Sequence, residues 1–349
     1  MIYLPHKKSK KLLIVTQAVD TEDPVLGFFV RWIEEIAKRV ESVEVICLKM
    51  GKFNFPKNVR VHSLGKEKGA PRFARRLRYA IRFKLLAWRI RHDYDAVFVH
   101  MNQEYVLIAG PLWKLLGKPI FMWRNHYAGS WLTDVAAVFC TKVFCTSKRS
   151  YTAKYAKTVL MPVGVDTERF FPDPHVARVP RSVLFFSRIA SSKRPEMLID
   201  ALASLAREGV DFTASIVGSP LPRDAAYHED LKEKVRSLSL ADRVNFSPGP
   251  PNYKAPDIYR AHEIFVNCSP SGMLDKMLFE AAACGCRVLA ASGDFASLAG
   301  IESRFDSSEE LAERLRVALE NPTSSVPAFV EANSLDVLAE KLSGAILEA

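Results

Sequence analysis

The chain has 349 residues, of which 48% are hydrophobic and 25% are charged, a composition ordinary for a globular protein and a length that favours two domains. Lysine and arginine exceed aspartate and glutamate by 49 to 39, and the net charge of +10 favours an anionic partner: a nucleic acid, a membrane surface or a phosphate-bearing substrate. No segment is long and apolar enough to cross a bilayer, and the six cysteines lack zinc-finger spacing, so we expect a protein of the reducing cytoplasm.

Strands and helices are predicted to alternate through the first half of the chain. Short apolar runs that end at polar loops are typical of buried strands in a parallel sheet, and longer amphipathic runs between them indicate helices. Strands are expected at 12–16, 43–47, 59–62, 95–100, 119–123 and 143–146. Helices are expected at 24–39, 71–92 and 107–116.

Residues 71–92 are predicted to form a basic amphipathic helix. The segment contains seven arginines and one lysine but no acidic residue. Apolar residues recur at helical spacing, with the arginines mostly on the other side: Phe73, Leu77, Ile81, Leu85 and Trp88. Two interpretations stand. The helix binds an anionic membrane surface, or it packs on the core through these apolar residues and its basic face is merely solvated.

Loops that follow predicted strands carry the candidate site residues of the first half. Gly27 lies in the loop after the first strand, and His126 lies directly after strand 119–123. Ligands bind at the carboxyl ends of parallel strands, which favours a functional interpretation of both. The competing interpretations are a helix-entry glycine and a structural histidine. Asp93-Tyr94-Asp95 has the Asp-x-Asp form of a metal site but precedes its strand, so we expect a solvated loop there.

A proline-rich linker at 172–180 separates a second series of alternating elements. Strands are expected at 183–186, 213–217, 244–246, 264–268 and 287–291. Helices are expected at 196–206, 227–238, 256–260, 274–284, 311–319 and 335–347. Arg188 and Lys193 stand in the loop between the first of these strands and its helix. That place suits the binding of a phosphate, and the competing interpretation is a surface pair of charges.

The stretch 269–286 is predicted to be a loop, a helix and an abrupt stop. Gly272 allows close approach of the backbone, and a helix that begins near Leu274 offers N–H groups and a positive dipole end to a phosphate. Gly285 suits the left-handed conformation at the helix end. The Glu280 carboxylate lies among apolar residues, where it needs a partner, and a ribose diol would serve.

The segment Glu280-Ala281-Ala282-Ala283-Cys284-Gly285 resembles the Glu-Ala-x-Ala-x-Gly signature of retaining glycosyltransferases with the GT-B fold, the family numbered four, also called glycosyl transferases group 1. Gly272 stands where that family has a first glutamate. Asp275-Lys276 resembles a branch of the family with an Asp-Lys pair in this loop. Residues 164–170 are similar to the Gly-Val-Asp-x-x-x-Phe segment that closes the family's first domain.

This resemblance implies two Rossmann-like α/β domains that face each other across a cleft. The acceptor-side domain would be residues 1–170, the nucleotide-sugar-binding domain 171–334, and residues 335–349 would pack back on the first domain. The implied activity is transfer of a sugar, with retention, from a nucleotide-diphosphate sugar to a hydroxyl of a lipid-linked acceptor or a cell-envelope glycan. The alternative is a non-catalytic GT-B protein that binds a nucleotide or a partner.

The resemblance also implies roles for individual residues. Arg188 and Lys193 would hold the diphosphate, Glu280 the ribose, and His126 the transferred sugar. Further nucleotide-sugar contacts are expected at Gly27, Gly218, Gly272, Asp275, Lys276, Met277 and Leu278. No cofactor or metal is expected, because the cations and the helix N-terminus would stabilise the leaving diphosphate. No nucleic-acid motif accompanies the arginines, so we expect a membrane contact through 71–92 rather than nucleic-acid binding.

Overall fold

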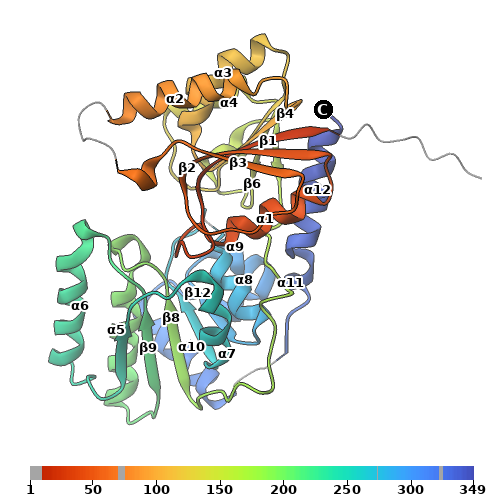
Figure 1. The fold of residues 1–349 in the computed structure, drawn as a ribbon. Coiled ribbons are helices and arrows are strands. Elements are labelled where there is room, and N and C mark those ends of the chain that lie inside the picture. The colour runs from red at the N-terminus through yellow and green to blue at the C-terminus, as the bar shows by residue number, and fades with distance from the viewer. Residues whose placement is uncertain (1–9, 70–74, 273, 322–324) are drawn as a thin grey trace, which may run out of the picture. The chain divides into compact units, whose positions relative to one another are not determined.

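The computed structural model describes residues 10–69, 75–272, 274–321 and 325–349 (Figure 1). The chain forms two compact α/β units: the first ends at Gly164 and takes in Leu335–Ala349, and the second is Val165–Ser334. Each is built on one sheet, and every described strand pair is parallel. The predicted fold class, two Rossmann-like α/β domains, is confirmed.

The first unit contains a seven-stranded sheet in the order β3-β2-β1-β4-β5-β6-β7. The strand order reverses between β1 and β4: Val15 of β1 pairs with Ile46 on one side and with Val99 on the other. The strands are β1 (Lys11–Val19), β2 (Ser42–Met50), β3 (Val59–Ser63), β4 (Ala96–His100), β5 (Ile120–Trp123), β6 (Lys142–Cys145) and β7 (Thr158–Leu160).

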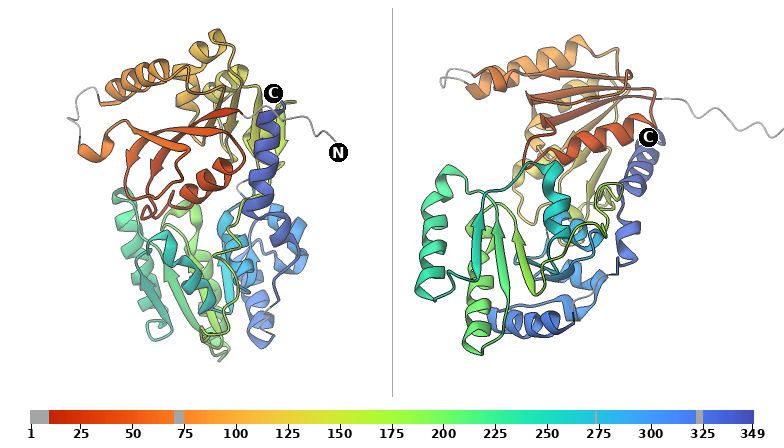
Figure 2. Two further views of the ribbon diagram at one scale, coloured as in Figure 1. Left: turned by 45° about the vertical axis from the view of Figure 1, so that its right-hand side comes forward. Right: turned by 60° about the horizontal axis from the view of Figure 1, so that its bottom comes forward.

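Helices cover both faces of this sheet (Figure 2). Alternate residues of β1 face opposite sides, so Leu13 belongs to one buried cluster and Leu12 to another. The cluster around Leu13 is covered by α2 (Arg75–Arg89), α3 (Gln103–Leu115) and α4 (Trp131–Phe139). The cluster around Leu12 is covered by α1 (Phe28–Ala37) and α12 (Leu335–Leu347). The C-terminal helix is thus part of the first unit's core.

The second unit contains a five-stranded sheet in the order β10-β9-β8-β11-β12. The strands are β8 (Ser182–Phe186), β9 (Thr213–Val217), β10 (Val244–Ser247), β11 (Ile264–Asn267) and β12 (Arg287–Ala290). One face packs against α5 (Pro195–Arg207), α6 (Ala225–Ser237) and α10 (Ser308–Glu320). The other side carries α7 (Ala255–Arg260), α8 (Lys276–Ala283), α9 (Gly293–Ala299) and α11 (Phe329–Ala332).

The structure differs from the sequence-based expectation at several short elements. Four were not predicted: β7, α4, α9 and α11. Of these, α4 carries apolar residues on most sides, so its sequence lacks the amphipathic period on which helix prediction depends. The expected solvated loop at Asp93-Tyr94-Asp95 is wrong for Tyr94. That side chain is fully buried, and its hydroxyl donates to Ala87 O and accepts from Trp113 Nε1.

The basic segment 71–92 is helical where it is described, over α2. Pro71, Arg72 and Phe73 lie outside the described residues. The helix packs on the core, as one of the two interpretations expects, but through Phe83 and Ala87. The apolar residues expected to make that contact are exposed where they are described: Leu77, Ile81, Leu85 and Trp88. Within the described ranges, no helix has both the length and the apolar character that a membrane crossing requires.

A buried histidine makes the stability of the first unit sensitive to acid. His100 ends β4, stacks on Phe29 with 3.7 Å between ring centroids, and has Nδ1 3.4 Å from Thr16 Oγ1. Burial lowers the pKa of His100 from 6.5 to about 3. Below pH 6.5, His100 therefore binds a proton in the unfolded chain but not in the folded state. The free energy of unfolding consequently falls as the pH falls.

We predict that the free energy of unfolding of the wild type falls by up to about 1.4 kcal/mol per pH unit through this one group as the pH falls from 6.5 towards 3. His100→Phe, which keeps a ring against Phe29, should flatten that slope in urea titrations followed by circular dichroism. The exposed His175→Phe serves as the matched control and should leave the slope unchanged. The same slope in all three proteins would show that His100 is not the group responsible.

Candidate functional site

The strand order of the second unit creates a natural binding place. Its sheet reverses order between β8 and β11, which are neighbours and parallel. In open α/β sheets, ligands bind outside the carboxyl ends of the strands at such a switch point. The loops that follow β8 and β11 hold Arg188, Lys193, Gly272 and Asp275, so four residues predicted from the sequence come together in one unit.

The loop after β8 presents an exposed arginine. Arg188 comes two residues after the strand, and its side chain is exposed. Within the described parts of the chain, no hydrogen bond, ion pair or ring contact engages its guanidinium. Arg194, at the end of the same loop, has a left-handed backbone with φ of 50° and donates from Nε to Cys268 O at 2.7 Å. This bond ties the β8 loop to the end of β11.

Lys193 and Asp275 form an ion pair across the switch point. Lys193 Nζ lies 2.6 Å from Asp275 Oδ2, and the two side chains are only 14% and 18% exposed. Ser269 Oγ donates to the same carboxylate oxygen at 2.8 Å, and Asn267 Nδ2 at 3.2 Å. Burial raises the pKa of Asp275, but the charge of Lys193 and these hydrogen bonds outweigh it and lower the pKa below 3.8. The carboxylate is therefore ionised at neutral pH.

Helix α8 begins next to this ion pair. Asp275 is the residue before the helix, and its side chain makes no capping bond, because the carboxylate turns to Lys193 instead. Gly272, with φ of +90°, has the left-handed backbone that suits glycine, and its N–H donates to Asp294 Oδ2 at 2.6 Å. In the first turn of α8, Leu278 is buried and Met277 is half-buried. The loop is thus held between β11 and α9.

Glu280 is buried in α8 and has a lysine for a partner. The residue is 3% exposed, and Lys276 Nζ lies 2.9 Å from Oε1. The Tyr259 hydroxyl donates to Oε2 at 3.4 Å. Burial raises the pKa of Tyr259 and the nearby carboxylate raises it further, so the hydroxyl keeps its proton. The first partner of Glu280 is one helical turn away, and its role towards a ribose stays a prediction.

Gly218 has a packing role at the end of β9. Its φ is +157°, and a Cβ built there would lie 1.8 Å from the carbonyl oxygen of Ser187. Its N–H donates to Ser247 O at 2.9 Å. The missing side chain therefore lets the carboxyl ends of β8 and β9 approach each other, and it sets the position of the residue before Arg188. Its contact with a nucleotide sugar stays a prediction.

The two candidates of the first unit occupy different settings. His126 is half-buried in the loop after β5, and its Nδ1 lies 2.9 Å from Ala128 N and 3.2 Å from Ala128 O. The ring stacks on Tyr127 at 4.6 Å. Gly27 precedes α1 with an ordinary right-handed backbone, φ −56°, which any residue can adopt. Both site assignments stay predictions.

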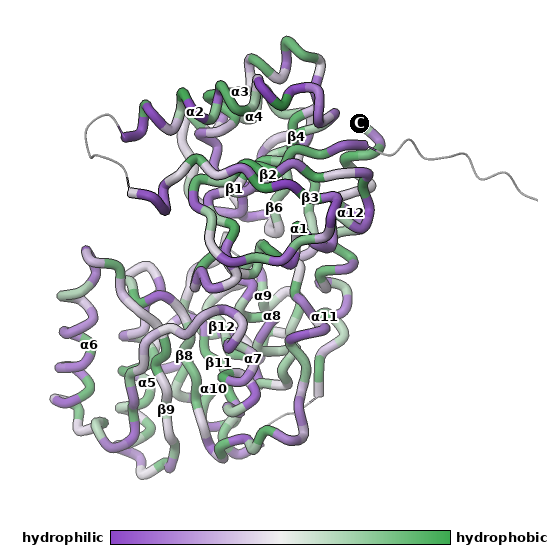
Figure 3. The backbone as a smooth tube through the Cα atoms, viewed as in Figure 1, coloured by the Kyte–Doolittle hydropathy of each residue, from purple (hydrophilic) through white to green (hydrophobic). Residues whose placement is uncertain are grey.

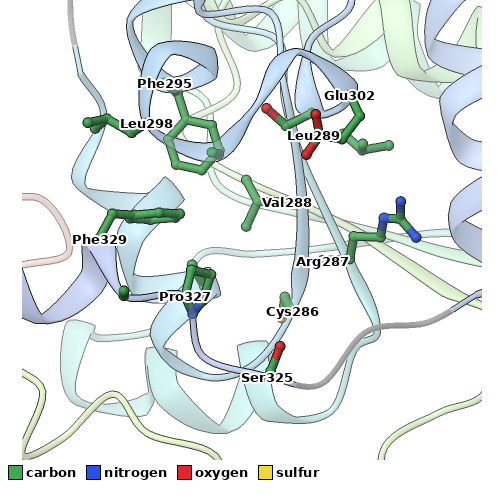
Figure 4. Close-up of a pocket in the computed structure, with 14 residues that line it drawn as sticks. Cys286, Arg287, Val288, Leu289, Phe295, Leu298, Glu302, Ser325, Pro327 and Phe329 are labelled. Atoms are coloured by element: carbon green, nitrogen blue, oxygen red, sulfur yellow. The ribbon is translucent and has the colours of Figure 1, made fainter.

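A cavity of about 420 Å³ lies beside the edge strand β12, between Phe295, Phe329 and Arg287 (Figure 4). Its described lining includes none of the predicted site residues. The described residues also contain no group of three His, Cys, Asp or Glu side chains placed to hold a metal ion. The cavity is thus separate from the predicted site residues at the switch point.

Sequence reasoning missed four residues of this arrangement: Arg194, Tyr259, Asn267 and Ser269. Asn267 offered a signal, because it is a polar residue at the end of an otherwise apolar strand. The i, i+4 spacing of Lys276 and Glu280 also predicts an ion pair on a helix. Tyr259 offered none, since one aromatic residue in a short helix is ordinary core composition.

Comparison with known sequences finds a family match within the second unit. Residues 180–321 match the sequence model of the family described as Glycosyl transferases group 1, a region that includes the switch point. The D-inositol 3-phosphate glycosyltransferase of Kineococcus radiotolerans is 33% identical over 155 residues, which are 41% of this chain and 36% of that protein. The GDP-mannose-dependent alpha-(1-6)-phosphatidylinositol monomannoside mannosyltransferase of Mycolicibacterium smegmatis is 32% identical over 146 residues, 37% of each chain.

The chain thus spans little more than a third of the length of the curated relatives it matches. Among solved structures, that of Anabaena HepE in complex with UDP and glucose is similar over 97% of this chain and 100% of that one, with a TM-score of 0.76 at 19% identity. This likeness shows the fold, which is that of GT-B glycosyltransferases. The sequence matches support the glycosyl transferases group 1 family.

We predict that Gly218→Ala destabilises the protein by about 2–4 kcal/mol, from the clash with Ser187 and the strained backbone together. Gly209→Ala is the matched control, because Gly209 also has a positive φ, +76°, but nothing within 4 Å of an added Cβ. It should cost only about 1 kcal/mol. Urea unfolding of the three proteins measures both; equal losses in the two variants would contradict the close approach of β8 and β9.

Proposed function

We propose that this chain is a glycosyltransferase that moves a sugar from a nucleotide-diphosphate sugar to a hydroxyl acceptor, with retention at the transferred carbon. One observation carries the proposal: an exposed arginine without a described protein partner, Arg188, stands in the loop after β8 at the switch point of the second unit, and Lys193 of the same loop contacts Asp275 at the N-terminus of α8. The family match of residues 180–321 supports the reaction class, and the resemblance of the α8 signature to retaining enzymes supports retention.

The proposed donor site provides positive charge where a diphosphate leaves. Breaking the bond between sugar and phosphate builds negative charge on the diphosphate, and fixed cations and backbone N–H groups stabilise that charge. Arg188 supplies a guanidinium suited to two-point contact with phosphate oxygens. Lys193 and the first turn of α8 supply the rest. With these groups in place, we propose that the diphosphate is held without a metal ion.

The remaining assignments follow the resemblance. Glu280 would hold the ribose hydroxyls of the donor, with Lys276 moving from the carboxylate towards the phosphates when the donor binds. His126 would contact the transferred sugar. The names of both curated relatives contain an inositol phosphate compound, whose free groups are hydroxyls, and this supports a hydroxyl acceptor. A lipid-linked or cell-envelope acceptor is consistent with the second name.

We predict that Arg188→Ala lowers turnover of the nucleotide sugar by about 10² or more, because a transition-state cation is lost, while stability is unchanged. The assay is release of nucleoside diphosphate from a panel of nucleotide sugars, repeated with EDTA, in which activity should persist. Arg207→Ala, an exposed arginine at the other end of α5, is the matched control and should keep full activity.

Lys193→Ala should also lower turnover, but it leaves Asp275 with a buried unpaired charge and costs up to about 3–5 kcal/mol of stability. The double variant Lys193→Ala/Asp275→Asn should recover much of that stability without recovering activity. Near-normal kinetics in Arg188→Ala and in the double variant would refute the donor site. Nucleotide binding without turnover by the wild type would instead favour the non-catalytic alternative.

Glu280 is tested through the ribose. We predict that Glu280→Gln weakens binding of the matching nucleoside diphosphate by about tenfold, because a charge-assisted hydrogen bond is lost, and that it matters much less for the 2′,3′-dideoxy analogue. Thermal shift against both ligands measures this, since a ligand of the folded state raises stability. Lys276→Met is the control: it removes the ion pair but should weaken both ligands equally. If Glu280→Gln also weakens both equally, the residue does not contact the ribose.

A further inference from the structure

Helix α2 carries two apolar stripes, and only one of them is buried. Phe83 and Ala87 are fully buried against the sheet of the first unit. At 100° per residue, a second stripe lies roughly opposite them. Its members are large, and each is about half exposed or more: Leu77 at 61%, Ile81 at 50%, Leu85 at 63% and Trp88 at 46%. Figure 3 shows the resulting mixture of hydrophobic and hydrophilic residues along this helix.

The charge of α2 has one sign. The helix contains six arginines and lysines and no acidic residue. On the same helical projection, Arg78 and Arg89 border one edge of the outward stripe and Lys84 borders the other. No acidic side chain among the described residues pairs with any of these three. Arg82 is different, because its Nη1 donates to Leu64 O at 2.9 Å.

The neighbouring helices of the same layer are also apolar on the outside. Large exposed side chains include Leu115 of α3 at 84%, and Trp131 and Val138 of α4 at 70% and 72%. Both helices cover the sheet face that α2 covers (Figure 2). An exposed apolar stripe of this kind on a water-soluble domain marks a surface that binds something.

We propose that the outward stripe of α2 is a docking surface for an anionic phospholipid bilayer. Leu77, Ile81 and Leu85 would enter the boundary between headgroups and acyl chains, and the flanking cations would contact lipid phosphates. Trp88 would lie at headgroup level, where tryptophan is favoured. The charge favours a membrane over a second copy of this chain, because a dimer through this stripe would bring one all-basic helix against another. This proposal does not depend on the proposed function.

The test is co-sedimentation of the full chain with vesicles of phosphatidylcholine that contain about one-third phosphatidylglycerol. The wild type should sediment at low salt and lose binding in high salt or with pure phosphatidylcholine. One variant removes charge, and we expect binding to weaken by about 100-fold or more: Arg75→Gln, Arg78→Gln, Lys84→Gln and Arg89→Gln. A second removes the stripe, and we expect a loss of about tenfold or more: Leu77→Ser, Ile81→Ser and Leu85→Ser.

Matched controls lie in the second unit and change as much charge or as much exposed apolar surface. The charge control is Arg223→Gln, Lys232→Gln, Arg236→Gln and Arg314→Gln. The apolar control is Leu238→Ser, Ile301→Ser and Val317→Ser. Both should sediment like the wild type, apart from a small loss from net charge in the first. All substituted side chains are exposed except that of Lys232, which is half-buried, and circular dichroism should show every variant folded.

Three outcomes would overturn the proposal. The wild type could stay in the supernatant with anionic vesicles at low salt. It could sediment, but with no difference between the α2 variants and their controls. Finally, light scattering could show dimers of the wild type but not of the serine variant of α2, while neither protein binds vesicles. The stripe would then be a contact between copies of this chain. Nucleoside diphosphate binding, measured in parallel, should be unaffected throughout, so these failures stay separate from a failure of the donor site.

Discussion

The ion pair between Lys193 and Asp275 is the interaction on which the arrangement of the second unit's site depends. It joins the loop after β8 to the loop after β11, and Arg194 makes a parallel tie from the same loop to Cys268. A buried ion pair stabilises a fold only weakly in net terms, because desolvation offsets the attraction. Its value here is positional: the two loops are held together at the switch point, and the carboxylate that α8 would otherwise use as a cap is drawn away from the helix N-terminus.

The cations of the site are of two kinds: lysines that are paired with a carboxylate, and an exposed arginine. Lys193 and Lys276 each have a carboxylate within 3 Å, so their charges are largely balanced inside the protein. Arg188 has no such partner among the described residues, and it is the exposed one. A diphosphate would therefore meet one unbalanced cation first, and could draw the lysines from their carboxylates only by offering them a stronger anion. In the proposed donor site, this order would give the donor a place to bind before the buried pairs rearrange.

Much of the fold was predictable, because strands such as β8 and β11 are short apolar runs that end in polar loops. The loops that carry Arg188 and Asp275 were predictable for the same reason. The pairings were not, since Lys193 and Asp275 are 82 positions apart and nothing local specifies their contact. For α2, periodicity identified the stripe of Leu77 and Ile81 but could not say which side the sheet covers. The sheet covers the other side, where Phe83 and Ala87 are fully buried and Tyr79 and Leu86 pack against the same cluster, so tertiary packing made the selection.

That selection has a physical cost that calls for an explanation. Leu77, Ile81 and Leu85 stay in contact with water, although removal of apolar surface from water is the main driving force of folding. The opposite face of the same sheet shows the ordinary solution, because α12 covers it and its large side chains, such as Leu338 and Leu342, are buried. The two faces of one sheet are thus treated differently. A helix that packs one apolar stripe on the core and keeps a second one outside, between cations, fits the bilayer surface that we propose for it, which is apolar below and anionic above.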